Sequence, residues 1–82
     1  MTVNEPSPAQ RLDLRGTPCP VNFIRCKLTL ESMAAGQVLE VSLDRGEPEA
    51  MVVPGLRQDG HLVELDGGDE SWVSLRVICG GG

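Results

Sequence analysis

The chain has 82 residues, 40% of them hydrophobic and 23% charged, which suits one compact domain with a modest core. Its net charge of -5, with one Trp and one Phe, does not suit a surface that neutralises phosphates and stacks on bases, so we expect no direct binding of nucleic acid. Three cysteines cannot all pair, and their spacing matches neither a zinc ribbon nor a CxxC redox pair, so we expect no disulfide framework, no metal site and no cofactor.

The two ends of the chain carry little that a core would bury. We predict a flexible arm over residues 1–10, MTVNEPSPAQ, and a flexible glycine tail over residues 80–82, with one domain over residues 11–79. The arm lacks the basic and apolar regions of a signal peptide, and no apolar run approaches the ~20 residues that span a bilayer. We therefore expect a cytoplasmic protein that does not contact a membrane.

The first predicted strand covers residues 11–15, where leucine alternates with polar side chains until Gly16 breaks the pattern. A helix is predicted to follow from Pro20 and to stop at Ala35-Gly36, because apolar residues recur at helical spacing and glycine is a common stop signal. The stripe expected to face the core consists of Phe23, Cys26, Leu30 and Met33. Since Cys26 belongs to this stripe, we expect it to pack in the core and not to act as a resolving thiol.

A second apolar ridge lies on a different side of the same helix, where Ile24 and Leu28 are four residues apart. Two interpretations of this ridge remain open. It either flanks the core or is exposed to contact a partner.

The rest of the chain predicts one more helix and three more strands. The strands cover residues 38–44, 61–65 and 72–79, with a turn over residues 66–69 that makes the last two an antiparallel hairpin and His61 a residue at a turn edge. A helix starts at Glu47-Pro48-Glu49 and ends by Gly60, and Pro54-Gly55 is expected to make it short, kinked or split. The order β-α-β-α-β-β favours an α+β fold, a two-layer sandwich of a mixed four-stranded sheet with both helices on one face.

The segment Thr17-Pro18-Cys19-Pro20 places a lone thiol at the junction of the first strand and the first helix. Because Pro20 suits the first helical position, Cys19 is predicted to be the N-cap, with the backbone N–H groups of Asn22 and Phe23 directed at its sulfur. Such a setting favours the thiolate. The alternative is a buried cysteine that fills the junction, although the flanking prolines favour an exposed corner.

The run from Leu12 to Pro20, LDLRGTPCP, followed by a helix, Gly36 and a strand ending in Asp44, resembles the TusA/SirA family of small sulfur carriers (sulfurtransferases). The likeness continues through Val53-Pro54-Gly55 and the two closing strands. It implies a cytoplasmic protein whose cysteine accepts sulfur as a persulfide from a cysteine desulfurase or related donor and passes it to an acceptor protein. Members of the family supply sulfur to transfer RNA thiolation, cofactor assembly or sulfur oxidation.

The family motif is Cys-Pro-x-Pro, and it places the nucleophile on Cys19 and the first proline on Pro20, whereas Asn22 stands where the second proline is expected. Asparagine restores an N–H donor and adds a side-chain amide. With this resemblance, Thr17 and Asn22 are expected to shape the pocket around the sulfur. The residues expected to support the anion or assist docking are Pro20, Asn22, Phe23, Arg15, Arg25 and Thr17.

Two other functions remain open. A binding or regulatory module of the same fold would keep the thiol and transfer nothing, and the loss of the second proline favours it. A carrier of a thiocarboxylate at the C-terminus is suggested by Gly80-Gly81-Gly82. Ubiquitin-like carriers of that kind open with a strand hairpin before the helix, whereas this chain is predicted to pass from strand to helix at once.

Overall fold

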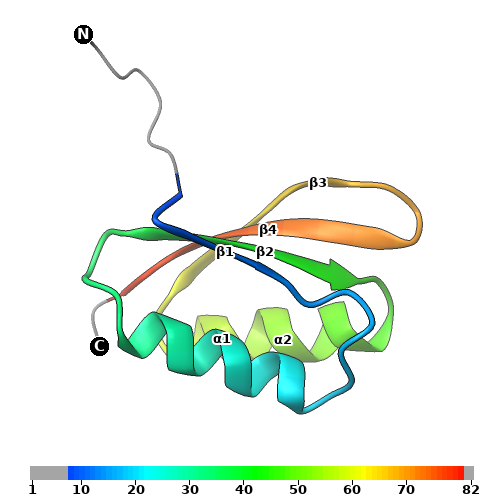
Figure 1. Ribbon diagram of the computed structural model, residues 1–82, viewed down its shortest axis with the longest axis horizontal. Helices are drawn as coiled ribbons and strands as arrows, with labels where there is room; N and C mark the ends of the chain where they lie inside the picture. The colour runs from blue at the N-terminus through cyan, green and yellow to red at the C-terminus, as the bar shows by residue number, and fades with distance from the viewer. Residues whose placement is uncertain (1–7, 81–82) are drawn as a thin grey trace, which may run out of the picture.

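The structure is a computed structural model and describes residues 8–80. Its elements are β1 (Gln10–Asp13), α1 (Val21–Glu31), β2 (Val38–Asp44), α2 (Glu47–Gln58), β3 (Leu62–Gly68) and β4 (Trp72–Ile78). The four strands form one sheet in the order β1-β2-β4-β3, in which β1 and β2 are parallel and the other pairs antiparallel. Both helices lie on the same side of this sheet (Figure 1). The predicted α+β sandwich is confirmed.

The ends of the chain are described only in part. Strand β1 begins at Gln10, one residue inside the predicted arm, and the Ala9 N–H donates to Val38 O at 2.8 Å. Residues 1–7 of the predicted arm and 81–82 of the predicted glycine tail lie outside the described residues. Within residues 8–80, neither helix is long and apolar enough to cross a membrane.

Both helices differ from their predicted extents. Helix α1 ends at Glu31 and not at Gly36, because the N–H groups of Ser32 and Met33 donate to carbonyls three residues back and tighten the last turn. Helix α2 runs from Glu47 to Gln58 with Pro54 inside it, so the predicted split into two pieces is wrong. The packing of one face of α2 on the sheet outweighs the loss of one backbone donor at Pro54.

Strand β3 extends to Gly68 through residues for which a turn was predicted. The register with β4 is irregular between Leu65 and Gly68. Gly67 and Gly68 have φ angles of 134° and 118°, which other residues rarely adopt, so the glycines form a bulge in the strand instead of ending it. The chain reverses after Gly68, where Asp69 Oδ1 accepts hydrogen bonds from the N–H groups of Ser71 and Trp72.

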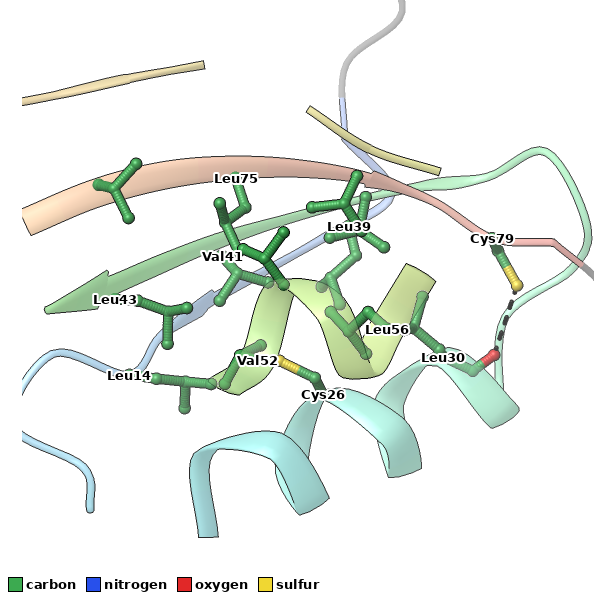
Figure 2. Close-up of a cluster of buried hydrophobic side chains, with 14 of the residues drawn as sticks. Leu14, Cys26, Leu30, Leu39, Val41, Leu43, Val52, Leu56, Leu75 and Cys79 are labelled. Carbon is green, nitrogen blue, oxygen red and sulfur yellow. Dashed lines mark hydrogen bonds between the residues drawn. The ribbon is translucent and has the colours of Figure 1, made fainter. Parts of the chain in front are cut away.

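The core lies between the sheet and the two helices. The inward side of β2 carries Leu39, Val41 and Leu43, all fully buried, which confirms the alternation predicted for this strand. Figure 2 shows these side chains facing Cys26 and Leu30 from α1 and Val52 and Leu56 from α2. The predicted core stripe of α1 is confirmed as well, with Phe23 partly buried against the cluster.

The other face of the sheet carries a row of alternating charges. Arg11, Glu40, Arg76 and Glu64 are in register across the four strands. The first pair is joined directly, because Arg11 Nε donates to Glu40 Oε1 at 3.0 Å. Opposite charges on neighbouring strands stabilise a sheet modestly and stay hydrated, so this row suits a face in contact with water.

Candidate functional site

Cys19 lies on the connection between β1 and α1, which is tied to the end of the sheet. The Gly16 N–H donates to the carboxylate of Asp44, at the end of β2, at 2.7 Å, and the Thr17 N–H donates to Leu14 O at 3.0 Å. Leu14 fills the core at this junction and is 1% exposed. Cys19 itself is exposed, so the alternative of a cysteine that fills the junction is wrong.

The predicted N-cap is also wrong. Helix α1 begins at Val21 with Pro20 as its N-cap, one residue later than predicted. The backbone N–H of Asn22 donates to Pro18 O at 3.1 Å, and that of Phe23 donates to Asn22 Oδ1 at 2.6 Å. Because these two amides have other acceptors, they do not supply the pocket for the sulfur that the sequence predicted.

The donor to the sulfur is a side chain instead. Asn22 is completely buried, and its Nδ2 donates to Cys19 Sγ at 3.4 Å. The hydrogen bond that Oδ1 accepts from the Phe23 N–H fixes which side of the amide faces the thiol. Asn22, which the sequence placed in the pocket around the sulfur, therefore contacts the thiol directly through its side-chain amide.

A cavity of about 240 Å³ opens beside the thiol. It is lined by Cys19, Pro20, Asn22, Phe23, Met51 and Gly55. The sequence predicted the first four of these residues as site residues and missed the two from α2. The Pro54-Gly55 pair inside an amphipathic helix was the available signal, because a glycine there often allows a close approach.

Gly55 allows Phe23 to lie against α2. A Cβ at position 55 would be 2.7 Å from Phe23 Cε1, so we expect Gly55→Ala to displace the ring and destabilise the protein by about 1–2 kcal/mol. In a Phe23→Leu background that ring atom is absent, and the same change is expected to stabilise by up to about 1 kcal/mol through helix propensity. Denaturant unfolding of the four proteins measures both values. Equal effects in the two backgrounds would contradict this interpretation of the glycine.

The two predicted arginines do not line the cavity. Arg15 Nε and Nη2 donate to the Asp13 carboxylate at 2.9 and 2.8 Å, and the guanidinium lies 5.1 Å from the centroid of the Trp72 ring. The hydrogen bonds from Arg15 lower the pKa of Asp13 to about 2. Arg25 is exposed on α1. Electrostatic or docking roles for these arginines stay predictions.

A family model described as "Sulfurtransferase TusA" matches residues 10–78. The chain belongs to the TusA family. A protein of Archaeoglobus fulgidus named "Putative sulfur carrier protein" is 47% identical over 53 residues, which are 63% of this chain and 59% of that protein. The matched part thus spans less than two thirds of that relative.

Two further proteins match over more of their length. A similarly named protein of Neisseria meningitidis serogroup A is 31% identical over 70 residues, covering 85% of this chain and 93% of its own. The crystal structure of a SirA-like protein from Desulfitobacterium hafniense superposes with a TM-score of 0.75 at 24% identity, covering 87% of this chain and 97% of that one. The second match shows that the two chains share a fold.

In this TusA-family chain the second apolar ridge of α1 is exposed. Ile24 and Leu28 are 46% and 60% exposed, and Val21 on the same side is 45% exposed, so the alternative that the ridge flanks the core is wrong. We call Val21, Ile24 and Leu28 the outer ridge. It begins two residues after Cys19 and points away from the sheet.

A larger cavity of about 480 Å³ lies at the opposite end of the helices, lined by Lys27, Leu30, Glu31, Met33, Ala35, Asp59, His61 and Cys79. Cys79 Sγ lies 3.6 Å from Leu30 O (Figure 2) and 3.8 Å from Met33 O. Cys79 is buried as part of the core cluster, so we interpret it as a packing residue. Within residues 8–80, no three His, Cys, Asp or Glu side chains are placed to hold a metal ion.

Proposed function

We propose that this TusA-family protein is a sulfur-relay protein that accepts sulfur as a persulfide on Cys19 and passes it to a protein acceptor. One observation carries the proposal: Cys19 is the exposed cysteine and lies beside a cavity, whereas Cys26 and Cys79 are buried. The names of the matched family and relatives, which refer to sulfur transfer and sulfur carriage, support it. A cytoplasmic location stays a prediction.

The proposed chemistry needs a thiolate and access for two partners. In loading, the Cys19 thiolate attacks the outer sulfur of a donor persulfide, a bond forms between Sγ and that sulfur, and the donor leaves as a thiolate. In unloading, an acceptor thiolate attacks the outer sulfur now held on Cys19, and the electron pair of the broken S–S bond returns to Sγ. The transferred sulfur keeps its oxidation state, so neither step requires an oxidant or a reductant.

The partner expected at the outer ridge is the protein that donates the sulfur, such as a cysteine desulfurase. Its persulfide must reach Cys19, and a surface that does so also meets Val21 and Ile24 at the start of α1. Arg25 and Lys27 stand beside the ridge on the same helix, although the whole chain has a net charge of -5. We therefore infer a donor surface that is apolar at its centre and acidic at its rim.

Incubation of the protein with a cysteine desulfurase and sulfur-labelled cysteine tests the proposed function. We expect label on the peptide that contains Cys19, and its removal by a thiol reductant. A relative with the complete Cys-Pro-x-Pro motif serves as the positive control. If that relative is loaded and this protein is not, the relay is excluded and the binding or regulatory module is favoured. Label at the C-terminal glycine would favour the thiocarboxylate carrier.

Cys26 provides the matched control for the assignment of one working thiol. Burial raises its pKa to about 11, so the thiol is protonated at neutral pH and faces the core. We expect Cys26→Ser to lower the free energy of unfolding by about 1–3 kcal/mol, because a hydroxyl replaces an apolar thiol, and to leave loading per folded molecule unchanged. Denaturant unfolding and the label assay measure the two effects. Loss of loading in properly folded Cys26→Ser would contradict the assignment.

A further inference from the structure

The side chain of Asn22 has an unusual position for a polar residue, because it is completely buried next to an exposed thiol. Its Oδ1 accepts a hydrogen bond from the Phe23 N–H at 2.6 Å, which holds the amide in one orientation. Its Nδ2 then faces Cys19, and within residues 8–80 the acceptor for this donor is Sγ, at 3.4 Å. The amide thus connects the first turn of α1 with the reacting atom.

A neutral thiol or disulfide sulfur accepts hydrogen bonds weakly, whereas a thiolate accepts them strongly. The buried N–H of Asn22 is therefore better satisfied when Sγ carries negative charge, because water does not reach the amide to replace a poor acceptor. A fixed donor of this kind stabilises whichever state of the reaction places charge on Sγ. In the relay, that state is reached when the cargo sulfur leaves.

We propose that Asn22 selects which sulfur of the Cys19 persulfide an acceptor thiolate attacks. Attack on the outer sulfur breaks the S–S bond and returns its electron pair to Sγ, which Asn22 Nδ2 contacts, and the acceptor becomes the persulfide. Attack on Sγ instead forms a mixed disulfide and expels the outer sulfur as hydrosulfide, whose negative charge this donor does not stabilise. Asn22 therefore favours transfer over the loss of cargo. This inference rests on the proposed function, since it concerns the same persulfide.

A direct test starts from protein loaded with sodium polysulfide, so that it does not depend on a donor protein, and uses glutathione as the acceptor. Mass spectrometry then separates glutathione persulfide, the product of outer attack, from hydrosulfide and the protein–glutathione mixed disulfide. We expect Asn22→Ala to slow the formation of glutathione persulfide about 10-fold and to raise the share of mixed disulfide. Leu62→Asn, on the face of the sheet opposite the helices, leaves the amide and the cavity in place and is expected to retain the product ratio of the wild type.

A second variant, Asn22→Pro, separates the loss of the side-chain donor from a folding defect in Asn22→Ala. Asn22→Pro introduces the residue of the Cys-Pro-x-Pro motif and removes the same donor, so we expect a folded protein with the product ratio of Asn22→Ala. An unchanged product ratio in folded Asn22→Pro would overturn the inference. A wild type that polysulfide loads and a cysteine desulfurase does not would overturn the proposed function alone.

Discussion

Cys19→Ser is expected to abolish sulfur loading and to leave the free energy of unfolding within about 0.5 kcal/mol of the wild type. Loading is lost because a hydroxyl does not attack a persulfide at neutral pH. Stability is kept because the position is exposed and because the serine oxygen can accept the hydrogen bond that Asn22 Nδ2 gives to the sulfur. Both the thiol and the serine thus satisfy the buried amide.

The label assay and denaturant unfolding measure these two effects on the same preparations. Cys79→Ser is a useful comparison, because its hydroxyl can replace the thiol that faces Leu30 O and because that thiol is far from the proposed chemistry. It is expected to load normally. Residual label in Cys19→Ser would mean that another group carries sulfur, and a large loss of stability would mean that residue 19 is chiefly structural.

Ile24→Asn is expected to reduce loading by a donor protein about 10-fold or more, which corresponds to the ~1.4 kcal/mol or greater loss typical of a central interface residue. The substitution replaces an apolar side chain that is 46% exposed by a polar one of no charge, so the electrostatics around Cys19 are little changed. Alkylation of Cys19 by iodoacetamide is expected to keep the wild-type rate. Slower loading with an unchanged alkylation rate would show that the substitution weakens docking of the donor and leaves the reactivity of the thiol unchanged.

Leu62→Asn is the matched control for the outer ridge. Leu62 is 63% exposed and projects from β3 in register with Ile78, on the face of the sheet opposite the helices. We expect loading by the donor protein to be unchanged in this variant. Equal loss in the two variants would indicate a general effect on the protein, and no loss in Ile24→Asn would place the donor elsewhere.

The arrangement of the helices and strands could be predicted from the spacing of hydrophobic residues in the sequence. In β2, polar residues alternate with Leu39, Val41 and Leu43. A register shift of one residue would turn these apolar side chains towards solvent, so the register is strongly specified. The spacing of Cys26 and Leu30 likewise decides which side of α1 packs inward. These features depend on the burial of apolar surface, which dominates folding, and they were predictable for that reason.

The geometry around the thiol was harder to predict, because it depends on competition among hydrogen bonds of similar strength. The rule that places proline at the first helical position gave Cys19 as the N-cap, but Pro18 O accepts the Asn22 N–H and the helix starts at Val21. The burial of Asn22 had a usable signal, since it precedes Cys26 by four residues and so shares its side of the helix. Asparagine is mostly exposed in proteins, so its complete burial here was not predicted.

In the proposed relay, the burial of Cys26 and Cys79 determines what happens to sulfur held on Cys19. A persulfide next to a second accessible thiol of the same chain would collapse into an internal disulfide and release its outer atom. In this protein both candidates for such a collapse are enclosed, one in the core and one against helix carbonyls. Under the proposed function, the lifetime of the bound sulfur is therefore governed by encounters with thiols of other molecules, and the protein would store the sulfur between partners.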